Sequence, residues 1–229
     1  MAVVERGYLV SVDARPRILV DPGSGTLERL ERSRFELALL EQILLTRLEV
    51  DRSGDLPALV AYLYAQGRAR PIALTGPAGM PGADEFVRLL FGPDGAWRYL
   101  AAFNGFGLTV REAPSALSDL AVYSIPVEPF LEELDVSLYA VAVPDGPLPA
   151  AAFRIDCGEE SIVLAGGLSR PTPSFYALAA ECGTLVSDGT LEAGTIDEIA
   201  TTCRAKALLV LDKRMIAGVR LISGLEQSL

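Results

Sequence analysis

Short apolar runs alternate with amphipathic segments along the whole chain. Residues 7–13 and 17–21 are apolar runs rich in β-branched residues, and the short stretch between them predicts a hairpin of two strands. Residues 26–41 mix leucines with charged residues, which predicts a helix with Thr26 in place to cap its start. The apolar run at 42–46 predicts a short buried strand.

The same alternation continues to the end of the chain. Helices are predicted at 54–68, with Pro57 near the start and Gly67 near the end, and at 82–92, with a strand from residue 71 between them. Region 107–145 alternates apolar and polar residues and indicates mostly strands. Later segments predict a strand pair about a Gly-Glu-Glu turn at 151–167, helices at 173–182 and 195–203, and strands at 184–189 and 206–212. This order predicts an α/β chain with two sheets or one large sheet.

Composition adds limits on size and partners. With 229 residues, of which 50% are hydrophobic, the chain can fill a sizeable core, and we expect a single domain over residues 1–229. The net charge of −10 argues against general attraction to a phosphate backbone, so a nucleic-acid partner is not expected. Two modest basic clusters are interpreted as solvated faces rather than binding sites: Arg15 with Arg17, and Arg29 with Arg32 and Arg34.

Cysteine usage and the first residues indicate the compartment. Cys157, Cys182 and Cys203 are widely spaced and form no CxxC pair, which favours buried thiols in a reducing environment. The first twenty residues place charges inside their apolar run, so neither a signal peptide nor a membrane-spanning helix is predicted. We therefore expect a cytoplasmic protein without a membrane partner.

The chain contains no histidine. Histidine is the usual group for proton transfer near neutral pH and the commonest imidazole ligand for metals. A Ser-His-Asp triad, a Cys-His pair and a histidine-bound zinc ion are therefore excluded within this chain.

Several loop sequences, in this order, resemble the metallo-β-lactamase superfamily and its ribonuclease Z and arylsulfatase-like branch. They are "ILVDPGSGTLERL", "ILLTRLEVDRSGDLPALV", "RPIALTGPAG", "PDGPLPAAAFRIDCGEESIVLAGG", "LVSDGT" and "LLVLDKR". The resemblance covers residues 7–216 and implies a four-layer αββα sandwich from which the family's usual first strand is missing. A sheet shortened in this way exposes an edge that a partner could cover.

The resemblance also implies where a metal site would lie. In such families the loop after the "ILLT" strand reads T-H-x-H-x-D-H and supplies ligands for two zinc ions. Residues 46–52 of this chain read TRLEVDR, so that among the metal-ligand positions only Asp51 keeps the family's identity. The resemblance places the remaining ligand positions at Asp145, Gly167, Ser187 and Lys213.

The residues at these positions are unsuited to zinc. Arg47 and Arg52 stay protonated and would repel a dication, and Gly167 has no side chain to bridge two ions. We therefore expect neither a metal ion nor another cofactor. The substituted charges predict a network of ion pairs in place of the metals, in which Arg47, Arg52 and Lys213 face Glu49, Asp51 and Asp145.

Two alternatives for this cleft stay open. Glu49, Asp51 or Lys213 could carry out metal-independent acid–base chemistry on a small anionic or carbonyl substrate. Alternatively, Glu49, Asp51, Asp145 and Asp188 could bind a hard cation such as magnesium or manganese in a carboxylate-bound hydrolase site. The catalytic residues, if the protein is an enzyme, are not identified by the sequence.

Other segments offer weaker candidates. The "DPGSG" stretch at 21–25 resembles a phosphate-binding loop, but a tight strand-to-helix turn is the favoured interpretation. Ser169 would need Lys213 as its base to act as a nucleophile. Cys182 and Cys203 lie on apolar helix faces, which indicates core thiols.

The aromatic-rich segment 86–107 suits either the core or a subunit interface. The family branch commonly pairs, so the resemblance implies a homodimer or a heterodimer with an active relative. We therefore interpret the protein as a catalytically degenerate hydrolase that has lost its dinuclear zinc site. It would act as a binding or partner subunit, and a small-molecule ligand is a further candidate partner.

Overall fold

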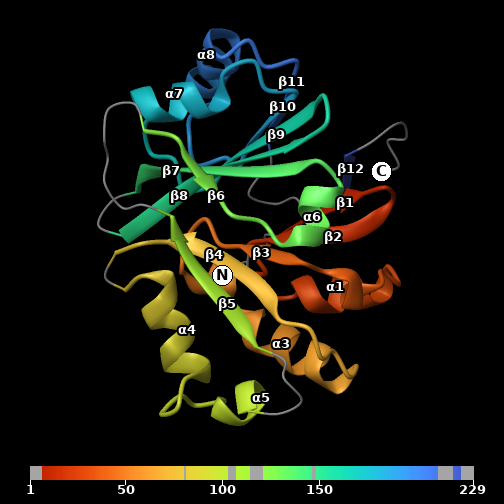
Figure 1. Ribbon diagram of the computed structural model, residues 1–229. Coiled ribbons are helices and arrows are strands. Elements are labelled where there is room, and N and C mark those ends of the chain that lie inside the picture. The colour runs from red at the N-terminus through yellow and green to blue at the C-terminus, as the bar shows by residue number, and fades with distance from the viewer. Residues whose placement is uncertain are drawn as a thin grey trace.

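The fold has four layers, in which two sheets face each other and helices cover their outer faces (Figure 1). The computed structural model describes residues 7–79, 81–102, 107–113, 121–145, 148–210 and 219–222. Each sheet has six strands among these residues. The predicted α/β class and αββα sandwich are confirmed.

The first sheet has the order β12-β1-β2-β3-β4-β5. β1 and β2 form the predicted hairpin, and the other neighbours are parallel. β12 pairs with β1, with Val219 opposite Leu9, so the edge expected to be open at β1 carries a later strand of the same chain. The strands are β1 (Tyr8–Val12), β2 (Arg15–Val20), β3 (Gln42–Leu44), β4 (Ile72–Pro77), β5 (Leu108–Ala113) and β12 (Val219–Ile222).

The second sheet has the order β11-β10-β9-β8-β7-β6. Strands β6 to β9 pair antiparallel, whereas β9, β10 and β11 pair parallel. The predicted strand pair about the Gly-Glu-Glu turn is β8 and β9. The strands are β6 (Tyr123–Ile125), β7 (Val136–Asp145), β8 (Leu148–Cys157), β9 (Glu160–Ala165), β10 (Thr184–Ser187) and β11 (Ala207–Val210).

Helices lie on both outer faces of the sandwich (Figure 1). The first sheet is covered by α1 (Thr26–Arg32), α3 (Leu56–Ala65), α4 (Ala83–Phe91) and α5 (Arg98–Ala102). The second sheet is covered by α7 (Pro173–Ala179) and α8 (Ala193–Thr202). The short elements are α2 (Val50–Ser53), α6 (Pro129–Glu133) and the 3-10 turn η1 (Leu37–Leu39).

Two local predictions were wrong. The helix expected over 26–41 ends at Arg32, because Ser33 caps it and Arg34 has a left-handed φ of 57°. Gly25 rather than Thr26 occupies its N-cap, without a side-chain bond. Region 107–145 is mostly strands in its described part, as predicted, and the short helix α6 lies within it because Pro129 suits the first turn of a helix.

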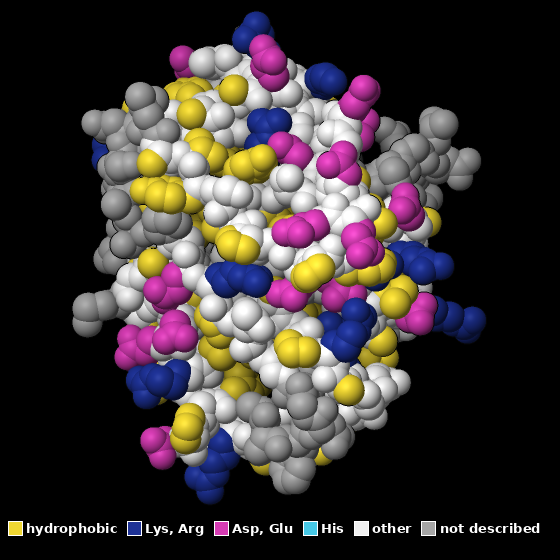
Figure 2. All heavy atoms as spheres, viewed as in Figure 1, with side chains coloured by type: hydrophobic (Ala, Val, Ile, Leu, Met, Phe, Trp, Pro, Cys, Tyr) yellow, Lys and Arg dark blue, Asp and Glu magenta, His cyan; other side chains and the backbone are white. Residues whose placement is uncertain are grey.

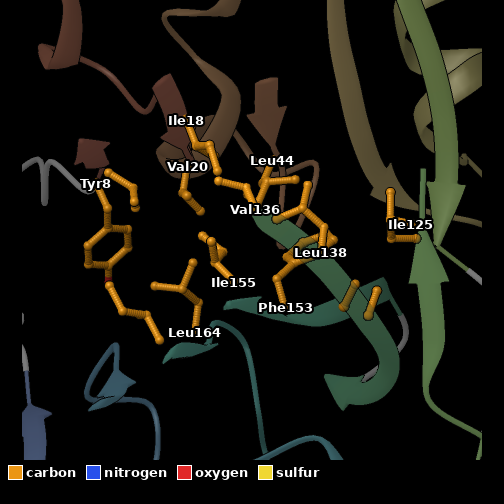
Figure 3. Close-up of a cluster of buried hydrophobic side chains, with 14 of the residues drawn as sticks. Tyr8, Ile18, Val20, Leu44, Ile125, Val136, Leu138, Phe153, Ile155 and Leu164 are labelled. Carbon is orange, nitrogen blue, oxygen red and sulfur yellow. The ribbon is translucent and has the colours of Figure 1, made fainter. Parts of the chain in front are cut away.

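Side-chain alternation along the strands builds three apolar layers. Val10 and Val12 face the space between the sheets, whereas Leu9 faces the helices on the outer side. Ile162 and Leu164 of β9 likewise point between the sheets, while Val163 points toward α7 and α8. Figure 3 shows the inner layer, where Ile18, Val20 and Leu44 of the first sheet meet residues of the second sheet: Leu138, Phe153, Ile155 and Leu164.

The surface carries charges of both signs. On the face shown in Figure 2, basic and acidic side chains are interspersed. The solvated-face interpretation was wrong for Arg17, which is buried, lies 3.6 Å from Glu41 and stacks 4.3 Å over the Phe130 ring. Within the described part of the chain, no helix combines the length and apolar character needed to cross a bilayer.

Candidate functional site

The charged residues of the candidate site lie where strands of both sheets end. Asp21 directly follows β2, Asp145 ends β7, and Asp188 directly follows β10. Because β2 and β3 run parallel, as do β9 and β10, the loops after these strands meet at one edge of the sandwich. This edge is the ordinary place for ligand sites in α/β folds.

Asp21 connects the ends of β2 and β3. Its carboxylate accepts hydrogen bonds from the Thr46 backbone N–H at 2.7 Å and from the Thr46 hydroxyl at 2.6 Å. Asp21 has a left-handed φ of 48°, and its carbonyl accepts a hydrogen bond from the Gly23 N–H at 2.7 Å. The chain therefore turns sharply after β2 and leaves this fully buried carboxylate pointing at the neighbouring strand.

Arg52 is the largest fully buried side chain of the described residues. It belongs to the one-turn helix α2, which follows directly on the "TRLE" loop. Its Nη1 donates to Asp21 Oδ2 at 3.1 Å, and its Nη2 donates to Asp188 Oδ2. Asp51, which is half-exposed, lies farther away at 3.6 Å from Arg52 Nε. A single guanidinium thus joins carboxylates from the two sheets.

The pKa values in this buried group shift for identifiable reasons. Burial lowers the pKa of Arg52, but the carboxylates of Asp21 and Asp188 outweigh burial, so the net shift is upward. Burial raises the pKa of Asp21 more than Arg52 and Thr46 lower it. For Asp188, burial is outweighed by Arg52 and by hydrogen bonds from Thr190 and Gly167, so its pKa lies below the usual value.

Arg47 occupies the outer part of the same site. Its Nη1 lies 2.8 Å from Asp145 Oδ2 and 3.1 Å from Glu49 Oε2, and its Nη2 lies 3.7 Å from Asp188 Oδ2. The side chain also crosses Gly167, where an added Cβ would meet Arg47 Cδ at 2.6 Å. The two arginines therefore lie one behind the other, and both contact Asp188.

The structure brings together most residues that the sequence pointed to. Arg47 pairs with Glu49 and Asp145, and Arg52 lies near Asp51. Gly167 lies beneath Arg47, and its N–H donates to Asp188 at 3.1 Å. Ser187 is buried, and its hydroxyl accepts the Gly189 N–H at 3.4 Å. Lys213 lies outside the described residues, so its place in the site stays a prediction.

Asp21 and Asp188 are the two partners of Arg52 that sequence reasoning did not assign to it. Asp188 was considered only as a metal ligand, and Asp21 only as part of a turn. One signal was available for Asp21, because a charged residue directly after the apolar run "RILV" falls at a strand end. The pairing itself spans 31 residues for Asp21 and 136 for Asp188.

The donor set does not fit the metal centre that the fold implies. In the described part of the chain, no three His, Cys, Asp or Glu side chains are placed to hold a metal ion. Glu49, Asp145 and Asp188 instead surround the guanidinium of Arg47. A cation approaching them would meet a fixed positive charge at short range.

The weaker candidates have structural roles. The Ser169 hydroxyl donates to the Pro144 carbonyl at 2.6 Å, and Cys182 and Cys203 are buried. At the "DPGSG" turn, the Leu27 N–H of α1 donates to the Asp55 carboxylate at 2.9 Å, so an acidic side chain already occupies this helix start.

Comparisons with known proteins agree on the fold. No protein-family model matches the chain. It is 26% identical over 216 residues to ribonuclease BN of Cronobacter sakazakii. The aligned residues cover 79% of this chain and 68% of that protein. It is 28% identical over 123 residues to ribonuclease Z of Parabacteroides distasonis. The aligned residues cover 51% of this chain and 38% of that protein.

Two solved structures extend the comparison. The short form of human tRNase Z superposes with a TM-score of 0.65 at 18% identity, covering 93% of this chain and 88% of that one. The metallo-β-lactamase fold protein YhfI from Bacillus subtilis gives a TM-score of 0.60 at 17% identity, covering 84% and 72%. The chain therefore has the metallo-β-lactamase fold and is related in sequence to ribonucleases Z and BN.

Proposed function

We propose that this protein is a catalytically degenerate relative of the ribonucleases Z and BN, in which two arginines stand in for the metal centre. One observation carries the proposal, namely the fully buried Arg52 guanidinium that pairs with Asp21 and Asp188. Two buried carboxylates would be costly without a counter-charge, and a guanidinium supplies that charge without any ion. The network thus provides the cohesion between the sheets that bound metal would otherwise supply.

The charges at the mouth of the site support loss of phosphodiester chemistry. The outer carboxylates belong to Glu49 and Asp51, whose side chains are 38% and 40% exposed. Exposed carboxylates repel the phosphate groups of RNA, and the net charge of −10 reinforces that repulsion. We therefore propose that the chain does not cleave RNA by itself.

A role as a binding or partner subunit follows from the loss of catalysis. Segment 86–107 exposes Leu89, Trp97 and Tyr99, and exposed aromatic side chains are favoured at interfaces. We propose that this segment pairs the chain with a second copy or with an active relative. Size-exclusion chromatography with light scattering should show a homodimer that Tyr99→Glu weakens. If wild type and variant are both monomeric and bind no active relative, this part of the proposal is wrong.

The first test of the proposal is metal content. Untagged protein should be dialysed against zinc, manganese and magnesium in turn and analysed by inductively coupled plasma mass spectrometry. We expect less than about a tenth of an ion per chain, because Arg47 and Arg52 hold the carboxylates that an ion would need. Stoichiometric uptake of any of the three would overturn the proposal and favour the carboxylate-bound hydrolase. Arg47→Ala is the matched variant, because it removes the guanidinium from Glu49 and Asp145 while leaving Arg52 paired with its own carboxylates.

A further inference from the structure

A cavity of about 250 Å³ lies on the outer side of the first sheet, away from the arginine site. It is bordered by α3, α4, α5 and β5, which lie beside one another in Figure 1. Among the described residues, its lining combines Asp84, Arg88, Gly92 and Gly107 with apolar side chains, which are Val60, Val87, Phe91, Leu100, Leu108 and Val110. In the same view, Figure 2 shows hydrophobic side chains between α4 and β5.

The size and lining of this cavity suit an apolar ligand. The space opens to solvent, so it is a surface pocket whose apolar lining a ligand could cover. A cavity of about 150 Å³ lined by similar side chains takes up benzene, so about 250 Å³ can hold an alkyl chain of about eight carbons. Gly92 and Gly107 lie at its rim, and among the described residues no atom lies within 4 Å of a Cβ placed on Gly107.

The rim also carries charge. Arg88 of α4 borders the cavity, and its guanidinium is 59% exposed. The ion pair between Arg88 and Glu85 is long, at 3.9 Å, and exposed pairs of this kind contribute little. Asp84, which also lines the cavity, lies one helical turn before Arg88, with about 6 Å between the two Cβ atoms. The carboxylate of a ligand bound at Arg88 therefore need not contact Asp84.

We propose that this cavity binds a medium-chain alkyl carboxylate, with the chain against Val87, Phe91 and Leu108 and the carboxylate at Arg88. The proposal goes beyond the proposed function and does not depend on the loss of the metal site. Its elements are an apolar chamber, an open rim and a loosely paired cation at the entrance. Together they match a ligand with an apolar tail and one negative end.

The chain contains its own reporter for this binding. Trp97 is the single tryptophan, and its ring lies 6.4 Å from the ring of Phe91, which lines the cavity. Octanoate, added below the concentration at which it forms micelles, should change the Trp97 emission in a saturable way while light scattering shows an unchanged oligomeric state, because Trp97 also lies on the proposed interface. Val110→Phe fills the cavity and should abolish the change. Absence of a saturable signal in the wild type, or an unchanged titration in Val110→Phe, would overturn the proposal.

Variants at the rim separate the charge from the cavity and do not disturb the core. Arg88→Gln should weaken octanoate binding by about two- to fivefold and leave 1-octanol binding unchanged. Glu85→Gln is the matched control on the same helix, and it should keep or strengthen octanoate binding because it removes a competitor for Arg88. Equal loss of octanoate binding in both variants would contradict the role of Arg88.

Discussion

Arg47 lies across Gly167, so that any side chain at Gly167 would collide with the arginine. An added Cβ would lie 2.6 Å from Arg47 Cδ and 3.0 Å from Arg47 Nε. In the family that the chain resembles, this position carries the aspartate that bridges two metals. Arg47 in its present position therefore leaves no room for a side chain at Gly167, the aspartate of the resemblance included.

This contact predicts that substitutions at the two positions are coupled. Gly167→Ala should lower the free energy of unfolding by about 2 kcal/mol, because the Cβ meets Arg47 and the backbone φ is +69°. In an Arg47→Ala background the clash with Arg47 should vanish, while the backbone strain and the approach of 2.9 Å to Asp145 Oδ2 remain, giving a coupling of about 1 kcal/mol. Urea unfolding of the four proteins measures this value. Strictly additive effects would show that Arg47 does not occupy the space over Gly167.

The buried ion pairs predict a large effect at Arg52. Arg52→Met should lower the free energy of unfolding by about 3–5 kcal/mol, because it leaves Asp21 and Asp188 buried without their cation. Arg32→Met is the matched control, because Arg32 pairs with Glu28 on the surface with its side chain 76% exposed. Chemical denaturation should show little change for this control. Similar losses in the two variants would contradict the central role of Arg52.

Much of the fold could be predicted because it follows from local patterns. The alternation of Leu9 with Val10 and Val12 places side chains on opposite faces of β1 whatever the rest of the chain does. The end of α1 was missed because Arg34 adopts a left-handed φ that arginine does not favour, so that no local pattern signals it, and α6 was missed because it depends on the single residue Pro129.

The candidate site could be predicted only along the loop that carries the motif. Arg47, Glu49 and Arg52 are close in sequence, so the resemblance was enough to place them together. The partners Asp21 and Asp188 arrive from other strands, and no local periodicity reports a contact across 136 residues. A buried guanidinium such as that of Arg52 needs carboxylate partners, but only the tertiary structure shows which carboxylates they are.

The buried thiols predict low reactivity in the native state. Burial, together with the neighbouring Cys182, raises the pKa of Cys203 to about 11, and burial raises the pKa of Cys182. Both thiols are therefore protonated near neutral pH and out of reach of reagents. A disulfide reagent such as 5,5′-dithiobis(2-nitrobenzoic acid) should react promptly with at most Cys157 in the native protein, and with all three cysteines in urea. Rapid native reaction at Cys182 or Cys203 would contradict their burial.

The two buried aspartates should affect the pH dependence of stability in opposite directions. The pKa of Asp188 is lowered in the fold, so its ionised form adds stability above the unfolded pKa, and this stability is lost as the pH falls through the folded pKa. The pKa of Asp21 is raised, so its ionised form costs stability at neutral pH, and this cost disappears as the pH falls.

The destabilisation by Asp188→Asn should therefore be larger at about pH 7 than at about pH 3.5. The destabilisation by Asp21→Asn should instead be smaller at about pH 7 than at about pH 3.5. Urea unfolding of both variants and the wild type at the two pH values measures these differences. If the destabilisation by the two variants changes equally between the two pH values, the pKa values of Asp188 and Asp21 are not shifted in opposite directions. The hydrogen bonds that Asp188 accepts from Thr190 and Gly167 would then not distinguish the two carboxylates that share Arg52.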